Sequence, residues 1–252
     1  MRIDFPRKED TPKLWALWKE AFGDGDEFLA TFERTAFCSR RCRAVFDGED
    51  VAAALYFFDC ALQGKKLAYL YAVATAKAYR GQGLCHQLMA DTHRHLKNEG
   101  YAGVILVPGE AELFSFYERM GYRIFGGIGE FSATADGGDT FIKSVSVEAY
   151  AEARRDFLPV GGILQEGENL RFLSAQADLY VGEDFVLAAR REGDRLFGIE
   201  LLGKRGSAPA ILTALGCREG IFRTPGEDRP FAMYYPLAED RITPTYFGLA
   251  FD

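Results

Sequence analysis

The sequence predicts a mixed α/β (α+β) protein built from two parts. Segments with the periodicity of strands and segments with the periodicity of helices follow one another along the chain. An apolar strand runs through a glycine-containing loop directly into an amphipathic helix at 71–85, and a similar strand, glycine turn and helix recur at 196–215. The length of 252 residues exceeds what one small domain needs. We therefore expect a first domain at 1–137 and a smaller second domain at 138–252, divided within the turn-rich run 135–139.

The first half reads as strands and helices in a definite order. Pro12 lies in the first turn of the first predicted helix, and Gly23, Gly100 and Gly121 each stand where a helix ends. Turn residues at 47–48 and 63–64 separate three strands of an antiparallel meander. The predicted strands are 2–6, 43–46, 51–62, 67–75, 103–107, a strand to about 125, and 128–134; the predicted helices begin near Thr11 and span 26–37, 84–98 and 111–120.

The second half reads as a further unit of helices and strands. Residues 192–194 have the composition of a hairpin turn between two strands. The predicted helices are 147–157, with 170–173 extending that helical layer, and 208–215; the predicted strands are 179–181, 184–191, 196–202, 221–224 and 230–237.

Composition and charge exclude several classes of protein. The chain is 48% hydrophobic and 27% charged, as expected for a soluble globular protein with a substantial core. Its net charge of −7 argues against a nucleic-acid-binding face and mildly favours a cationic or neutral small partner. No apolar run approaches eighteen residues, so we expect no membrane span.

The cysteines and the opening residues indicate a cytoplasmic protein. The chain opens MRIDFPRKED, which lacks the pattern of a secretory leader, and it carries five cysteines, an odd number. We expect reduced thiols and no disulfide framework. Cys38 and Cys42 have no second pair at ligand spacing, so we expect no zinc site and no other metal.

The stretch YAVATAKAYRGQGLC at 71–85 has the chemistry of an anion-binding loop. A helix begins with unpaired N–H groups and a partial positive charge, and glycines at that point let a phosphate approach the backbone. The loop lacks the third glycine of a dinucleotide-binding fingerprint and the Lys-Ser/Thr pair of a triphosphate loop. An ordinary tight turn between strand and helix remains the alternative.

Two motifs in this region resemble those of the GNAT superfamily of acyl-CoA N-acyltransferases. The run VATAKAYRGQGL resembles the family's cofactor loop, Arg/Gln-x-x-Gly-x-Gly/Ala, with Arg80, Gly83 and Cys85 at its three defined positions. Cysteine in the last position departs from the family pattern. The run LFSFYERMGY at 113–122 resembles the family's tyrosine helix and the strand that follows it. The resemblance implies a central mixed sheet flanked by helices, with acetyl-CoA as co-substrate.

The resemblance also implies roles for particular residues. The main chain of the last residues of strand 67–75 would align the pantetheine arm, and the loop with the first helical turn would hold the pyrophosphate. The residues so assigned are Val73, Ala74 and Thr75 for the first role, and Arg80, Gly81, Gln82, Gly83, Leu84, Cys85 and His86 for the second. Tyr117 would give a proton to the leaving sulfur, since a phenol near pKa 10 is protonated at neutral pH. By periodicity alone Tyr117 is a core aromatic.

The sequence does not identify the group that accepts the amine's proton. Carboxylates at several places could do so, although each is more often a solvated surface residue. The candidates are Asp59, Glu110, Glu112, Glu130, Asp252 and an ordered water. His86 and His93 lie two turns apart on one helix with no carboxylate between them, and we expect them to be solvated or packed rather than metal ligands.

The second half resembles a degenerate copy of the same unit, as in the tandem enhanced-intracellular-survival (Eis) type of acetyltransferase. Pro209 in its short helix, and the lack of a tyrosine helix after it, favour a structural role. In the Eis type the chain end reaches the active site; here the apolar ending YFGLAFD could dock in that way or close the second domain as a strand.

Two classes of function follow from the resemblance. The first is an N-acetyltransferase acting on a primary amine of a small molecule or peptide. The rival is a catalytically inactive acyl-CoA-binding or sensing module. In the family the helices at 11–22 and 26–37 wall the acceptor pocket, whereas the pattern alone makes their aromatic side chains core. Whether the protein is a homo-oligomer is left open.

Overall fold

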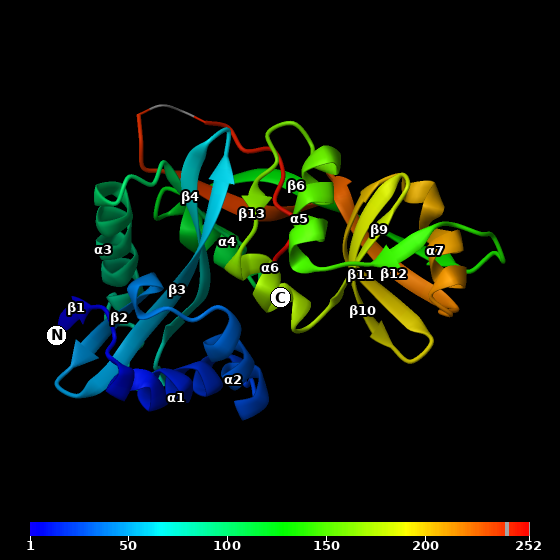
Figure 1. Ribbon diagram of the computed structural model, residues 1–252. Coiled ribbons are helices and arrows are strands. Elements are labelled where there is room, and N and C mark those ends of the chain that lie inside the picture. Colours follow the sequence, from blue (N-terminus) through cyan, green and yellow to red (C-terminus); the bar gives the residue numbers. More distant parts are fainter. Residues whose placement is uncertain (240–241, 252) are drawn as a thin grey trace. The chain divides into compact units, whose positions relative to one another are not determined.

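The computed structural model describes residues 1–239 and 242–251, and their contacts form two compact units (Figure 1). The first unit comprises 1–123 and 233–242, and the second comprises 124–232 and 243–252. The chain thus passes from one unit to the other after Arg123, and its last twenty residues contribute to both. The domains expected at 1–137 and 138–252 stay a prediction.

The first unit is built on the predicted meander. Its strands are, in sheet order, β1 (Arg2–Asp4), β2 (Cys42–Asp47), β3 (Asp50–Leu62), β4 (Lys65–Thr75), β5 (Gly103–Leu106) and the last residues of β13 (Arg229–Pro236). Neighbours pair antiparallel except β4 and β5, which are parallel. Its helices are α1 (Thr11–Phe22), α2 (Asp26–Thr35), α3 (Leu84–Asn98) and α4 (Ala111–Glu118), with 3-10 turns η1 (Lys8–Asp10), η2 (Ser39–Arg41) and η3 (Lys77–Tyr79). The predicted helices and meander are confirmed.

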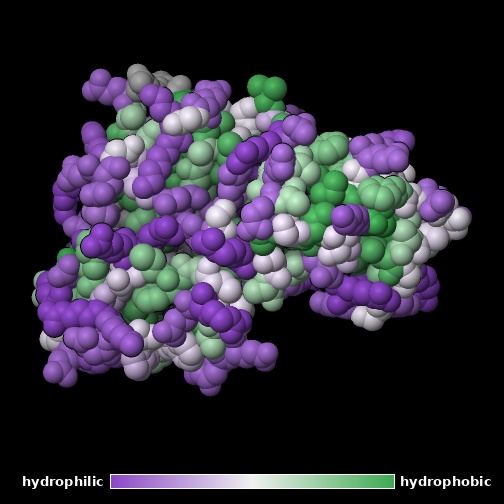
Figure 2. Space-filling view, viewed as in Figure 1, coloured by the Kyte–Doolittle hydropathy of each residue, from purple (hydrophilic) through white to green (hydrophobic). Residues whose placement is uncertain are grey.

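The sheet of this unit separates two apolar layers. Successive residues of a strand point to opposite faces, so on β3 Leu55 and Phe57 join the core under α3 and α4, whereas Tyr56 and Phe58 join the aromatic rings of the opposite face. The helices α1 and α2 carry the rings that meet them there. The outer side of α3 is hydrophilic, as expected for an amphipathic helix on a core (Figure 2).

The second unit is also built on strands of mixed direction. Its strands are, in sheet order, β6 (Arg123–Thr134), β12 (Glu219–Gly226), β11 (Arg195–Gly203), β10 (Phe185–Glu192), β9 (Asp178–Gly182) and β7 (Ile142–Ser144), and β8 (Leu164–Gln165) is a short additional strand. Of these, β11 and β12 pair parallel, whereas β6 with β12, β10 with β11, β9 with β10 and β7 with β9 pair antiparallel. Its helices are α5 (Val147–Phe157), α6 (Glu168–Ser174) and α7 (Ala208–Ala214), with the turn η4 (Arg205–Ser207). The helix α7 packs on one apolar core, and α5 contacts β9, β10 and β11. None of the helices in the described part of the chain is long and apolar enough to cross a membrane.

One pair of predicted strands is wrong. The segments expected to end near 125 and to restart at 128 form the single strand β6. Gly126 lies so close to the backbone of Thr245 that a Cβ atom would stand 2.1 Å from its carbonyl oxygen. The glycine therefore permits a close approach of two chain segments instead of marking a turn. The short strands β7 and β8 were not predicted.

A buried ion pair ties α5 to β11 in the second unit. Arg154 and Glu200 are 2% and 0% exposed, and the guanidinium donates to the carboxylate from Nε at 2.6 Å and from Nη2 at 2.8 Å. The Tyr246 hydroxyl donates to the same carboxylate at 3.0 Å, which anchors the C-terminal segment. Gln165 exchanges two hydrogen bonds with the main chain of Leu249. Residues 246–250 are therefore buried within the second unit.

Glu200→Ala is expected to destabilise the second unit strongly. The substitution leaves the Arg154 charge buried without its partner, which costs about 3–5 kcal/mol of unfolding free energy. Glu219→Ala is the matched control, because Glu219 pairs with Arg195 at the same distance of 2.6 Å but at the surface; its loss should be below about 1 kcal/mol. Urea unfolding of both variants measures the difference, and equal losses would contradict this account of the pair.

Candidate active site

The loop between β4 and α3 leaves the first turn of α3 open to a ligand. Gly83 precedes the helix with φ of 73°, in the left-handed region that favours glycine, and no side chain caps the helix. The first helical hydrogen bond runs from the Gln87 amide to the Gly83 carbonyl at 3.1 Å. Among the described residues nothing accepts from the main-chain N–H groups of Gly83 to His86. These amides, with the helix dipole, make a site suited to a phosphate group.

The rest of the loop is held by side chains around it. Arg80 is exposed, and its Nε donates to the Thr75 carbonyl at 3.1 Å, which brings its positive charge beside the end of β4. The Lys77 amide donates to the Glu20 carboxylate at 2.9 Å, and the Tyr79 hydroxyl donates to Asp47 at 3.3 Å. The loop is thus fixed in shape while its glycines stay exposed.

The end of β4 has an open edge next to this loop. A β-bulge at Ala72, with φ of 48°, shifts the register with β3, so that Tyr71 faces Tyr56 but Ala74 faces Ala54. The parallel pairing of β4 with β5 ends at Tyr69 in the described structure. Residues 73–75 therefore pair with β3 on one side only. Their other edge can take an extended chain with amide groups, by strand-like hydrogen bonds.

Tyr117 lies on α4 with its hydroxyl available. Its side chain is 7% exposed and packs edge-on against the rings of Phe116 and Tyr122. Within the described chain its hydroxyl has no hydrogen-bond partner. Burial, with a smaller contribution from the nearby Cys85 thiol, raises the pKa of Tyr117 above its ordinary value. The phenol therefore keeps its proton at neutral pH, close to the start of α3.

Cys85 lies between the loop and Tyr117. It is partly buried, packs against the core under α3, and its pKa is raised to about 11 by burial. The sequence pattern placed it at the loop position that is small in the family. In the structure it also lies close enough to influence the ionisation of Tyr117.

The Cys85 thiol is expected to react slowly at neutral pH. A thiolate is the reactive form, and a pKa of about 11 leaves roughly a thousandth of this thiol ionised at pH 8. Iodoacetamide should modify Cys85 at least about a hundredfold more slowly than free cysteine at pH 8, with a rate that rises as the pH approaches 11. Peptide mass spectrometry against time measures it, and modification as fast as free cysteine would show that the thiol is not buried in this way.

The structure separates the candidate proton acceptors. Asp59 accepts from the Tyr101 hydroxyl and pairs with Arg41 and Lys66 at 3.5 and 3.6 Å, so its carboxylate is already engaged. Glu110 and Glu112 are exposed at the start of α4. Glu130 belongs to the second unit and pairs with Arg223 and Arg229. Asp252 lies outside the described residues. None of the described carboxylates is singled out as the base.

Three residues that contact Tyr117 or its neighbour were not predicted as part of a site. Tyr122 is 2% exposed, and its hydroxyl lies 2.6 Å from His93 Nε2. The His93 ring stacks on Tyr235, with ring centres 4.3 Å apart. His93 was expected to be solvated or packed, and it is packed. Tyr235 is distant in the sequence, and nothing in the local pattern links it to α3.

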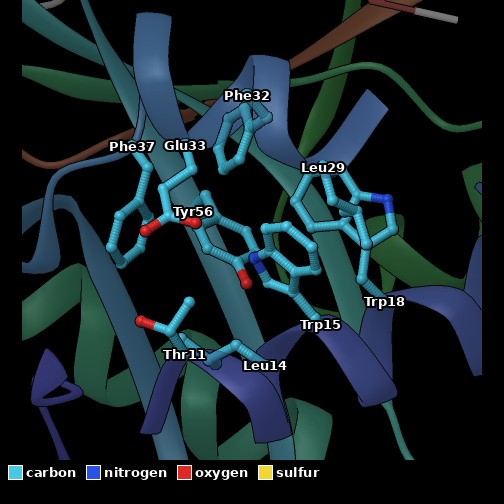
Figure 3. Close-up of a pocket in the computed structure, with 9 residues that line it drawn as sticks. All are labelled: Thr11, Leu14, Trp15, Trp18, Leu29, Phe32, Glu33, Phe37 and Tyr56. Carbon is cyan, nitrogen blue, oxygen red and sulfur yellow. The ribbon is translucent and has the colours of Figure 1, made fainter. Parts of the chain in front are cut away.

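Two of the aromatic rings on α1 and α2 belong to the core. Trp18, Phe32 and Tyr56 are 2%, 5% and 6% exposed and contact one another. A hollow beside them has Trp15, Phe37, Tyr56 and Glu33 around it (Figure 3). Its free volume of about 10 Å³ holds about one water molecule. The core role expected for most of these aromatics is confirmed for Trp18 and Phe32, whereas Phe22 is 48% exposed.

The described residues contain no metal cluster. No group of three or more His, Cys, Asp or Glu side chains in 1–239 and 242–251 could hold a metal ion. The five cysteines are free.

The open first turn of α3, the open edge of β4 and Tyr117 on α4 all lie within the part of the chain that matches a family model. Residues 2–125 match the family model described as "Acetyltransferase (GNAT) domain". The first half of the chain is thus a GNAT acetyltransferase domain. No curated protein sequence matches the chain.

Solved structures share the fold across nearly the whole chain. A GCN5-related N-acetyltransferase from Kribbella flavida has a TM-score of 0.72 and 16% identity, over 93% of this chain and 70% of that one. A GCN5-related N-acetyltransferase from Anabaena variabilis has 0.74 and 13%, over 94% and 73%. Eis1 from Mycobacterium abscessus has 0.71 and 13%, over 94% and 74%. The likeness therefore extends over both units, and the mixed α/β fold expected from the motifs is confirmed.

Proposed function

We propose that this protein is an N-acetyltransferase that passes an acetyl group from acetyl-CoA directly to a primary amine of a small molecule or peptide. The observation that carries the proposal is the set of unpaired amides from Gly83 to His86 in a domain of the GNAT family. These amides would hold the pyrophosphate, with the Arg80 charge beside them. The open edge at Val73, Ala74 and Thr75 would hold the amides of the pantetheine arm.

Acetyl-CoA supplies a thioester whose acetyl carbon is attacked by the amine while the carbon–sulfur bond breaks. Tyr117 is assigned to the departing sulfur: its hydroxyl donates a hydrogen bond and then its proton as negative charge develops there. The amine loses a proton to water or to a carboxylate, and the phenol regains one from water. Burial keeps the Tyr117 proton in place until that moment, because its pKa lies above the ordinary value.

The second unit is assigned a structural role as a degenerate copy. Its corresponding strand, turn and helix are β11, η4 and α7. The Asp184 carboxylate occupies that turn, accepting from the Ser207 hydroxyl at 3.1 Å and pairing with Lys204 at 3.2 Å. A carboxylate at this point repels a phosphate and occupies the place where the phosphate would bind. This supports one working cofactor site, in the first unit.

The proposal is tested by mixing the purified protein with acetyl-CoA and a panel of amines while free thiol is measured. The panel should include polyamines, aminoglycosides, amino acids and peptides with free N-termini, because a net charge of −7 favours cationic acceptors. Amine-dependent thiol release, with the acetylated amine found by mass spectrometry, is the expected result. Tight binding of acetyl-CoA with no transfer to any amine would instead indicate the inactive binding module.

A further inference from the structure

Tyr122 holds Tyr117 through both its main chain and its ring. The helix α4 ends with the Tyr122 amide donating to the Tyr117 carbonyl at 3.1 Å and the Gly121 amide donating to the Glu118 carbonyl at 2.9 Å. Gly121 has φ of 93°, as this type of helix end requires. The rings of Tyr117 and Tyr122 meet edge-on, with centres 5.8 Å apart. Any movement of Tyr122 is therefore passed directly to Tyr117.

Tyr122 is in turn fixed to α3 and β13. Its hydroxyl lies 2.6 Å from His93 Nε2, and the Tyr122 and His93 rings are themselves in contact. Tyr235 stacks on His93 and contacts the Tyr122 ring, with centres 5.3 Å apart. A Cβ atom at Gly121 would stand 3.1 Å from the Tyr235 ring. The hydrogen bond between Tyr122 and His93 is thus closely packed by residues of α3, of the turn after α4 and of β13.

The charge state of the pair suits a permanent hydrogen bond. Burial, with the charge of His86 adding to it, lowers the pKa of His93 to about 4. Burial also raises the pKa of Tyr122, with Tyr117, Tyr235 and Cys85 contributing. Both groups are neutral from about pH 5 to 9. In either tautomer of the imidazole a hydrogen bond forms, because the phenol donates to an unprotonated Nε2 or accepts from a protonated one. The bond therefore persists over the whole range in which the enzyme would work.

We propose that Tyr122, His93 and Tyr235 form a clamp that positions the Tyr117 hydroxyl relative to the first turn of α3. The helix α3 carries His93 and, two turns earlier, the amides of the cofactor site, whereas α4 carries Tyr117. The clamp joins the two helices and so sets the distance from the cofactor's anchor to its proton donor. Tyr122, His93 and Tyr235 are positioning residues in this scheme. The inference rests on the proposed role of Tyr117.

The clamp also gives the end of the chain a task in the first unit. Tyr235 belongs to β13, whose residues 233–236 pair with β5. Residues 233–242 are counted with the first unit by their contacts. Tyr235, one of the positioning residues of the GNAT domain, thus lies more than a hundred residues after the second motif, which ends at Tyr122.

Tyr122→Phe is the central test, because it keeps the ring and removes only the hydroxyl. We expect kcat for acetyl transfer to fall by about tenfold or more, since small displacements of a reacting group slow a reaction steeply. The dissociation constant for acetyl-CoA should change less than about twofold, because the loop amides are untouched. Tyr101→Phe is the matched control: Tyr101 is also buried in this unit, but its hydroxyl donates to Asp59. The control should keep its kcat.

A double-substitution cycle separates positioning from stability. In the Tyr117→Phe background, Tyr122→Phe should lower kcat no further, because the group it positions is gone. His93→Leu breaks the same hydrogen bond from the other side, and the Tyr122→Phe/His93→Leu double variant should lose no more activity than the more affected single variant. Independent, multiplying losses in either combination would overturn the clamp, as would a normal kcat for Tyr122→Phe.

The outcomes also distinguish the two levels of inference. No thiol release by the unmodified protein with any amine would reject the proposed function itself. Full activity of Tyr117→Phe would reject the role of Tyr117. A slow Tyr117→Phe variant beside a fully active Tyr122→Phe variant would reject the clamp alone.

Discussion

Tyr117→Phe is expected to lower kcat by about a hundredfold or more while leaving the affinity for acetyl-CoA nearly unchanged. A positioned general acid contributes about 10²- to 10⁴-fold to a rate. The substitution removes the only ionisable atom of the side chain and keeps the ring that packs against Phe116 and Tyr122. Because the hydroxyl has no partner among the described residues, its removal leaves no buried group unsatisfied and should not destabilise the fold.

The measurement is steady-state thiol release at saturating acetyl-CoA, together with calorimetric titration of the cofactor. Phe116→Leu is a useful comparison, because it changes the packing on the same helix without touching a hydroxyl. A Tyr117→Phe variant with an unchanged kcat would show that water or another group protonates the sulfur.

Gly83→Asp is expected to weaken acetyl-CoA binding by about ten- to hundredfold, the value of one or two hydrogen bonds to a charged group. Aspartate is among the preferred residues before a helix, since its carboxylate accepts from the amides of the first turn. The new side chain would therefore take the amides assigned to the pyrophosphate and add a negative charge beside them. Nothing lies within 4 Å of a Cβ atom at Gly83, so there is space for the side chain, and the strain that its φ of 73° imposes on any residue but glycine is shared by the control below.

Gly100→Asp is the matched control for this prediction. Gly100 follows the other end of the same helix, also has positive φ, and has open space around a Cβ atom. The control adds the same charge to the same helix and should leave cofactor affinity within about twofold, since the effect of a charge on a helix end is confined to that end. Equal losses of affinity in both variants would mean that the net charge of the protein determines cofactor binding, and not the amides of Gly83 to His86.

Much of the fold could be predicted from local pattern. The helix over 84–98 has its apolar residues at helical spacing between Gly83 and Gly100, and it forms with those bounds. The meander followed from turn residues between alternating strands. The sequence predicts β6 as two strands with a break at 126–127, whereas Gly126 and Gly127 lie within one strand and pack closely against residues distant in sequence. The return of 233–242 to the first unit depends on contacts that no local pattern encodes.

The candidate site could be predicted only in its local parts. The loop and the tyrosine helix are short continuous motifs, so their residues were found from the sequence. The open edge at 73–75 depends on the bulge at Ala72 and on where pairing with β5 ends, and neither is visible in the sequence. The pairing of His93 with Tyr122, and the stacking of Tyr235 on His93, arise from three separate segments. The sequence pattern can identify such residues as buried, but it cannot show which of them contact one another.

A crystal structure of the protein with coenzyme A would show directly whether the first turn of α3 holds the cofactor. We expect pyrophosphate oxygens within hydrogen-bond distance of the amides of Gly83 to His86, and the sulfur end of the molecule close to the Tyr117 hydroxyl. Coenzyme A bound elsewhere, or a first turn of α3 that contacts only solvent at saturating coenzyme A, would contradict it.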